Sequence, residues 1–302
     1  MIGVAAALQM RAFMAFRETD IVLKGAVRLT AGMAVTALAL AAVVPASAQG
    51  RLDARYQVSL GGIPIGKGAW VIDLAENQFT AAASGATSGL LRVFASGQGS
   101  GASRGHIVGG HPVPASFAAS ITSDRKTEEI RMTLASSGVK DFVISPAPTP
   151  DPERVPITDA HRRGASDPMT ASLFRVPGNG HPVGPMACQR VAPVFDGRLR
   201  YDLQFVFKRM ERVKADKGYE GPVAVCAVYF VPVAGHIPSR AAVKYLMKQR
   251  DMETWLAPVG NTRVVVPYRV SIPTPIGVGV MEATQFVSVS LPRAATAKPP
   301  TQ

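Results

Sequence analysis

The two cysteines are the residues of this sequence best suited to covalent chemistry. Cys188 opens the segment CQRVAPVFDGRLRYDLQF, and Cys226 lies inside the apolar run VAVCAVYF. A catalytic cysteine needs a free thiolate beside a histidine, whereas two cysteines in an oxidising compartment pair with each other. We expect a disulfide between Cys188 and Cys226, with free buried cysteines as the alternative.

A serine motif and five histidines are the other groups with chemical potential. Residues 101–105 (GASRG) match the G-x-S-x-G of α/β-hydrolases, but the next residues, HIVGGHPVP, are incompatible with the helix that this motif requires. We therefore interpret residues 101–105 as a flexible turn and expect no catalytic residue. The histidines lack the paired spacings of metal ligands, so we expect neither a metal site nor a cofactor.

The Asp196-Gly197 pair is a hairpin signal inside the segment that begins at Cys188. Apolar residues alternate with polar ones over 201–208, which is typical of a half-buried strand. We interpret Asp196 as a turn residue rather than an acid catalyst. The segment is then the central, disulfide-clamped hairpin of a sheet, with Arg198 and Arg200 beside the turn as its contact groups.

The elements that must position these residues are mostly strands. Short alternating or continuous apolar segments are separated by Gly, Pro and Asn at intervals of about ten residues, which is typical of all-β proteins. The sequence predicts one all-β domain over 51–292, built as a single strongly curved antiparallel sheet that forms a spiral or half-barrel. Its strands are expected at 55–60, 68–74, 79–83, 116–122, 128–134, 139–144, 201–208, 224–231, 253–257, 264–272 and 278–290.

Helical signals are limited to two short segments. Asp167 followed by Pro168 is a start signal for a helix that runs through Phe174. Residues 239–248 (SRAAVKYLMK) place apolar residues on one helical face. The proline-dense stretch 146–156 cannot form a central strand or a helix, and we expect a long surface loop there.

The N-terminal residues predict export. An apolar run over 29–48 follows Lys24 and Arg28 and ends in Ala-Ser-Ala, which is the pattern of a secretory signal peptide (1–48) cleaved after Ala48. A membrane-spanning helix is the alternative, but the uninterrupted apolar stretch 31–44 is shorter than the roughly 20 residues that a span needs. We expect a soluble periplasmic protein with a disordered tail at 293–302.

The chain is basic, with a formal net charge of +12 that cleavage after Ala48 lowers to +10. Its basic residues form scattered pairs without interleaved aromatic residues, so we expect no nucleic-acid partner. An exported basic protein meets anionic lipid headgroups instead, and peripheral contact with an anionic membrane surface follows as an expectation. The oligomeric state is left open by these patterns.

Four stretches together resemble a known family. In order they are YQVSLGGIPIGKG, VFDGRLRYDLQF, CAVYFVPVAGH and PYRVSIPTPIGVGVMEATQF. They are similar to a proteobacterial family of exported envelope proteins, the domain of unknown function numbered three-one-zero-eight. The resemblance implies a β-rich periplasmic fold of the lipoprotein-carrier kind and a role in envelope maintenance, and it assigns no catalytic residue. The basic charge and the cysteine pair depart from the lipoprotein-carrier pattern.

These observations favour a non-enzymatic periplasmic protein of cell-envelope homeostasis that binds a lipid, a peptide or an envelope protein. One alternative is a carrier that holds an apolar ligand in a β-cavity. The alternative from another class is a periplasmic hydrolase whose catalytic residues are dispersed in the sequence.

Overall fold

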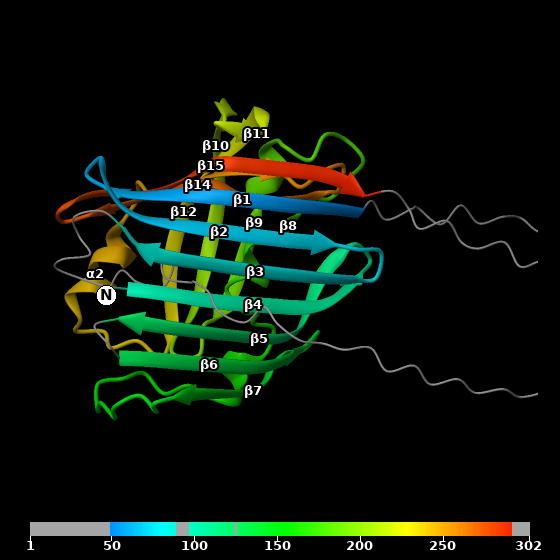
Figure 1. Ribbon diagram of the computed structural model, residues 1–302. Coiled ribbons are helices and arrows are strands. Elements are labelled where there is room, and N and C mark those ends of the chain that lie inside the picture. The colour runs from blue at the N-terminus through cyan, green and yellow to red at the C-terminus, as the bar shows by residue number, and fades with distance from the viewer. Residues whose placement is uncertain (1–48, 89–96, 124–125, 292–302) are drawn as a thin grey trace, which may run out of the picture. The chain divides into compact units, whose positions relative to one another are not determined.

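A computed structural model describes residues 49–88, 97–123 and 126–291 of the chain. The expected signal peptide (1–48) and the expected tail (293–302) lie outside these residues. The described residues form one 15-stranded sheet with short helices between some of its strands (Figure 1). None of the helices in these residues is long and apolar enough to cross a membrane.

The first half of the sheet is a meander of seven antiparallel strands. Its first strand alternates strictly, with Leu52, Ala54 and Tyr56 buried and Arg51 and Arg55 exposed, because successive side chains of a strand point to opposite faces. The seven strands are β1 (Gln49–Leu60), β2 (Ile63–Leu74), β3 (Gln78–Thr87), β4 (Gly97–Val108), β5 (His111–Ser123), β6 (Lys126–Ala135) and β7 (Gly138–Ser145).

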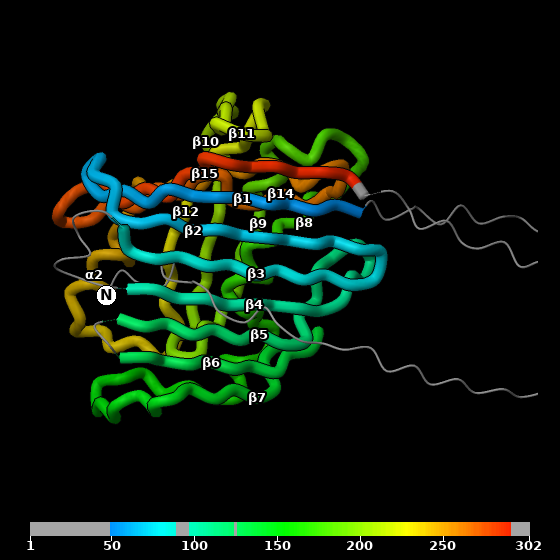
Figure 2. Tube along the Cα trace, in the orientation of Figure 1, coloured from blue at the N-terminus to red at the C-terminus, as the bar shows by residue number. Residues whose placement is uncertain are grey.

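The second half of the sheet contains the longer strands. Its main strands run in the order β15, β14, β13, β12, β10 and β9, and β15 pairs with β1 to join the two halves. The first and last strands therefore lie side by side in the middle of the sheet (Figure 2). The strands are β8 (Phe174–Arg175), β9 (Arg190–Phe195), β10 (Arg200–Lys214), β11 (Lys217–Gly218), β12 (Glu220–Ala234), β13 (Glu253–Pro258), β14 (Val264–Thr274) and β15 (Gly277–Leu291).

The two ends of the sheet, β7 and β9, are brought together by the residues that follow helix α1 (Asp159–Arg162). Arg163 pairs with Gly138 at the start of β7, and Ser166 pairs in parallel with Val194 of β9. We call this junction, residues 163–166 between β7 and β9, the seam. The sheet is thereby nearly closed, which confirms the predicted strongly curved antiparallel sheet.

Two hydrophobic clusters cover the two faces of the second half of the sheet. The larger cluster joins both halves of the sheet, since it contains Leu52 and Phe79 as well as Val225 and Phe286. The smaller cluster contains Phe205 and Leu256 and lies under the segment 171–188. Each cluster removes large apolar side chains from water, and the smaller one anchors the segment 171–188 through residues such as Phe174 and Val183.

Strand β4 corrects the prediction of a flexible turn at residues 101–105. Gly99, Ser103 and Gly105 are buried on one face of this strand. A Cβ atom on Gly105 would lie 2.0 Å from the carbonyl oxygen of Val113 in β5, so only glycine allows this approach at the bulge after Arg104. Glycine here reflects close strand packing, which composition alone does not distinguish from a turn.

The helix predicted to run from Pro168 through Phe174 is also corrected. Asp167 does cap a turn, because its carboxylate accepts hydrogen bonds from the backbone N–H groups of Met169 and Thr170. Only the 3-10 helix η2 (Thr170–Ser172) follows, since Phe174 then pairs with Val265 of β14 as strand β8. Sheet pairing therefore overrides the local helix signal.

The second predicted helix is present as α2 (Ala241–Lys248), between β12 and β13. Helix α1 follows the proline-dense loop and was not predicted. The helix is one turn long, and its N-cap residue Thr158 forms a capping box with His161. Such a short helix leaves too few residues for a periodic apolar pattern.

Candidate functional site

Cys188 and Cys226 form a disulfide, with their Cα atoms 5.4 Å apart. Cys188 ends the 3-10 helix η3 (Pro185–Cys188), directly before β9, and Cys226 lies in β12. Because β10 lies between β9 and β12, the bond links the end of the segment 171–188 to β12 across β10. Both cysteines are fully buried in the smaller cluster, and their sulfur atoms are committed to each other.

The turn between β9 and β10 is held by the Asp196 side chain. One carboxylate oxygen accepts hydrogen bonds from the backbone N–H groups of Arg198 and Leu199, at 2.8 and 2.7 Å. Burial raises the pKa of Asp196, and these backbone hydrogen bonds oppose that shift. One oxygen of the carboxylate therefore fixes the backbone of the turn.

Gly197 brings this turn against the opposite end of the sheet. Its φ of +95° favours glycine, and a Cβ atom there would lie 3.0 Å from the side chain of Ile130 in β6. The β9–β10 hairpin consequently forms one end of the strand order and packs against the other end at the seam. The prediction of a central hairpin is wrong, because a hairpin signal carries no information about its position in the sheet.

The two arginines beside the turn are engaged with carboxylates. The Arg198 guanidinium donates to Glu128 of β6 at 2.9 Å and so links β6 to the hairpin. Arg200 donates to Asp202 at 2.6 Å within β10. Arg198, but not Arg200, also lines a groove next to the seam.

This groove, which we call the seam groove, has a volume of about 440 Å³. Phe142 and Ile144 of β7 and Ile157 of the loop that follows β7 form its apolar part, and Asp151, Arg154 and Arg198 supply charge. The full lining is Phe142, Ile144, Pro148, Thr149, Pro150, Asp151, Arg154, Ile157, Gly197 and Arg198.

A bulge in β10 positions a network of charged side chains. It lies between Phe207 and Arg209, where one extra residue interrupts the pairing with β12. An extra residue reverses which face the later side chains occupy. Phe205 and Phe207 accordingly pack on the smaller cluster, whereas Val213 packs on the larger one.

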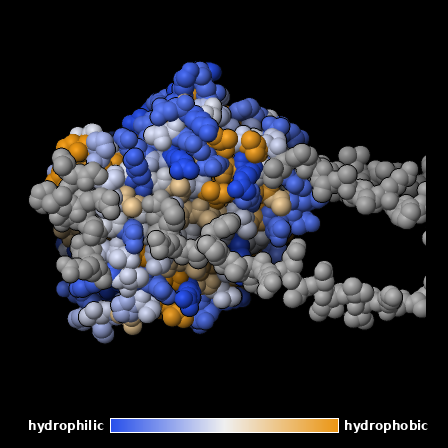
Figure 3. All heavy atoms as spheres, in the orientation of Figure 1, coloured by the Kyte–Doolittle hydropathy of each residue, from blue (hydrophilic) through white to orange (hydrophobic). Residues whose placement is uncertain are grey.

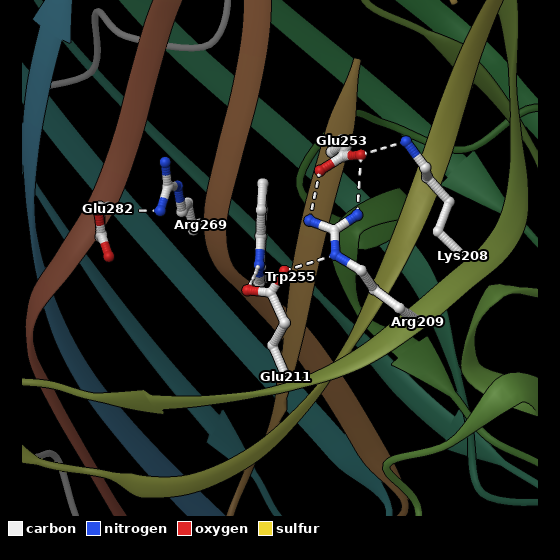
Figure 4. A network of polar contacts seen from close by, with 7 residues as sticks. All are labelled: Lys208, Arg209, Glu211, Glu253, Trp255, Arg269 and Glu282. Carbon is white, nitrogen blue, oxygen red and sulfur yellow. Dashed lines mark hydrogen bonds and ion pairs between the residues drawn. The ribbon is translucent and has the colours of Figure 1, made fainter. Parts of the chain in front are cut away.

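Beyond the bulge, charged residues surround Trp255 of β13. Arg209 donates to both oxygens of Glu253 at 3.0 Å and to Glu211 at 2.6 Å, while Lys208 pairs with Glu253. Trp255 donates its indole N–H to Glu211 at 2.7 Å. Figure 4 shows the Glu253 carboxylate between the two cationic groups. Bidentate pairs of this kind hold the strands in one register.

Arg269 of β14 extends this network across the indole. Its guanidinium lies 4.6 Å from the Trp255 ring, and it forms an ion pair with Glu282 of β15 at 3.7 Å. Figure 4 shows Arg269 between the indole and Glu282. The network contains three cationic and three anionic side chains, so it presents no net charge to a ligand.

Two carboxylates of the network, those of Glu211 and Glu253, have pKa values below the ordinary one. Hydrogen bonding to Arg209 lowers the pKa of Glu253. Burial raises the pKa of Glu211, but the hydrogen bonds from Trp255 and Arg209 outweigh it, so its pKa also lies below the ordinary value. A glycosidase pair needs one carboxyl group that stays protonated. The pKa values of Glu211 and Glu253 are both lowered, so neither residue fits the role of the protonated acid.

Ser103, the serine of the G-x-S-x-G pattern, lies in a buried polar cluster. Its hydroxyl contacts the Thr170 hydroxyl at 2.8 Å and donates to the Asp167 carboxylate at 3.2 Å. Burial raises the pKa of Asp167, which is fully buried. The cluster joins β4 to the capped turn and is closed to solvent.

The described surface has no large apolar patch on the face in view (Figure 3) and no cluster of metal ligands. The face seen in Figure 3 is mostly hydrophilic, with its hydrophobic residues in small separate groups. Across residues 49–88, 97–123 and 126–291, no three side chains of His, Cys, Asp or Glu come together as metal ligands would.

Comparisons with known proteins give one finding. The family model described as Protein of unknown function (DUF3108) matches residues 55–284, which is most of the chain. Searches of the curated proteins and of the solved structures each gave no match.

Proposed function

The chain belongs to the DUF3108 family, and we propose that it is a non-enzymatic protein of the cell envelope that binds an extended apolar segment of another envelope protein in the seam groove. The observation that carries this proposal is the apolar lining of the groove beside the free edge of β7. Export to the periplasm is part of the same proposal.

The edge of β7 supports a peptide as the occupant. The strand ends the sheet order, and its far edge is occupied only at Gly138, which pairs with Arg163, and at Lys140, whose carbonyl oxygen accepts from Arg162. Among the described strands, none pairs with this edge farther along. Free edges bind extended chains through backbone hydrogen bonds, and adjacent pockets take alternate side chains. Val143, which is 58% exposed, lies on the outer face of this strand, opposite to Phe142 and Ile144.

Three observations support an exported protein that binds a partner and does not catalyse a reaction. Both cysteines are committed to a disulfide, which suits an oxidising compartment. Ser103 is closed to solvent. The pKa of Glu253 lies below its ordinary value, so this carboxylate is a poor general acid or base near neutral pH.

The test compares two tryptophan substitutions in an otherwise intact chain. Thr149→Trp fills the groove from its exposed loop, and Asn179→Trp places the same side chain on an exposed loop that does not line the groove. Each variant and the natural sequence are expressed in a strain that lacks the gene. Survival in detergent and in cell-wall antibiotics is measured, together with the amount of protein in the periplasmic fraction.

We expect the deletion to sensitise the cells, and we expect the natural sequence and Asn179→Trp to restore resistance. Thr149→Trp should accumulate equally in the periplasm and fail to restore resistance. Normal resistance of the deletion strain, or restoration by Thr149→Trp, would contradict the proposal. Stoichiometric lipid found by native mass spectrometry of the purified protein, absent from Thr149→Trp, would assign the groove to an apolar ligand instead.

A further inference from the structure

A second pocket lies at the other end of β9, away from the seam groove. It has a volume of about 340 Å³ and is formed by the start of β5 and by the segments 166–177 and 186–191. Arg175 and Arg190 lie in its wall, with no acidic residue among the described residues that line it. We call it the arginine pocket.

Two arginines whose charge no described carboxylate balances face the same pocket, unlike Arg198 of the groove and Arg209 of the polar network. Arg198 and Arg209 each pair with a carboxylate. In the described structure neither Arg175 nor Arg190 has a carboxylate partner. Placing two unpaired cations around one half-enclosed space carries a desolvation cost that a bound anion would offset.

Both guanidinium groups are held in place by their surroundings. Arg190 lies over the Phe174 ring at 4.4 Å, and burial lowers its pKa. Arg175 lies directly on the backbone of Gly110, where a Cβ atom would come within 2.4 Å of its Nε atom. Arginines fixed in this way lose little conformational freedom when they bind a ligand.

Neutral donors complete the pocket. The Ser166 hydroxyl is buried and has no hydrogen-bond partner in the described structure. Gln189 adds an amide to the lining. Burial, then the charges of Arg175 and Arg190, lower the pKa of His111, so its ring is neutral near pH 7 and can donate one N–H.

We propose that the arginine pocket binds a phosphate group. Two fixed guanidinium groups match the charge of a phosphate, and Ser166 and Gln189 can serve the oxygens that the arginines leave free. The pocket is larger than one phosphate ion, so it has room for the group that carries it. Met186 and Val191, which are 50% and 53% exposed, give the lining an apolar side suited to an amphiphile. This proposal does not depend on the seam groove.

The test uses the mature chain and a variant with both Arg175→Gln and Arg190→Gln. Its matched control carries Arg55→Gln together with Arg131→Gln, which removes the same charge from two exposed positions on β1 and β6. Binding of inorganic phosphate, and of acetate at equal ionic strength, is measured by calorimetry. Binding to vesicles of phosphatidylcholine, with and without phosphatidic acid, is measured by flotation.

We expect the natural sequence and the control to bind phosphate and to bind acetate more weakly, and we expect the pocket variant to lose at least tenfold in phosphate affinity. Added binding to phosphatidic acid vesicles that the pocket variant loses would identify a lipid headgroup as the source, and binding of free phosphate alone would identify a soluble one.

Equal affinity for acetate, equal weakening in the control, or no measurable binding in any arm would overturn the proposal. If the pocket variant fails to fold, Arg175→Lys alone serves in its place, since it keeps the charge and removes the planar fork. Unchanged phosphate affinity in that variant would also overturn it.

Discussion

The ring of Phe142 in β7 packs edge-on against the ring of Phe195 in β9, with the ring centroids 4.9 Å apart. These strands are the two ends of the strand order. Phe195 is fully buried, and Phe142 packs against the same cluster. The two rings therefore form an apolar contact between β7 and β9, in addition to the backbone bridges of the seam.

We predict that Phe195→Ala lowers the free energy of unfolding by about 3 to 5 kcal/mol, because a buried aromatic ring is replaced by a cavity. The measurement is urea unfolding followed by fluorescence. Val206→Ala serves as the control, since Val206 is 52% exposed and its truncation should change stability by less than about 0.5 kcal/mol. Equal effects of the two substitutions would mean that the seam is not packed as described.

The disulfide should stabilise the domain by about 3 to 4 kcal/mol, because it shortens the unfolded chain across a separation of 38 residues. The variant with both Cys188→Ala and Cys226→Ala removes the bond without adding a buried hydroxyl group. Its unfolding free energy is compared with that of the natural sequence, each with and without reductant. Reductant should destabilise only the natural sequence, and an equal response of both proteins would refute the bond.

Gly197→Ala should destabilise the protein by about 1 to 3 kcal/mol, since it adds backbone strain and a contact with Ile130. Gly178→Ala provides the control, because Gly178 also has a positive φ, of +81°, but has open space around its Cβ position. We expect the control to cost less. Gly197→Ala should cost less in an Ile130→Ala background, because that substitution removes the Cγ2 atom that the added Cβ atom would meet. An unchanged cost would place the whole effect in the backbone.

Glu253→Gln should show a pH-dependent loss of stability. The hydrogen bond to Arg209 lowers the folded-state pKa of Glu253 below its ordinary 4.5, so the unfolded state binds more protons between the two values. The stabilisation is therefore fully present above pH 4.5 and is lost as the pH falls through the folded-state pKa.

The variant should lose about 1 to 2 kcal/mol at pH 7, as expected for hydrogen bonds to a partly exposed charged group. This loss should shrink as the pH falls below the ordinary pKa of Glu253. Urea unfolding of both proteins at several pH values measures it. A loss that stays constant down to the acid transition would show that Glu253 acts through packing rather than charge.

The sequence predicted the strands well wherever side chains alternate. The run over 201–208 became part of β10, and VAVCAVYF lies in β12. Strand β4 was missed because its buried face is made of glycine and serine, which carry no apolar signal. The helix through Phe174 was overpredicted because pairing with β14 is a long-range effect that local capping does not reveal.

The candidate sites were harder to predict than the fold. The disulfide could be predicted because the sequence contains only two cysteines. The seam groove and the arginine pocket combine residues from segments far apart in the chain, such as Phe142 with Arg198 and His111 with Arg190. The basic character of the chain was visible in the sequence, but only the structure shows that Arg175 and Arg190 line one pocket without an acidic residue in its described lining.

The pairing of β1 with β15 has a consequence for the order of assembly. Gln49 at the start of β1 lies opposite Leu291 at the end of β15, so the strand pair in the middle of the sheet joins two segments that lie far apart in the chain. The meander from β1 to β7 can form early, but the two halves are joined only when β15 arrives. A nascent chain stopped before β15 therefore exposes the edge of β1.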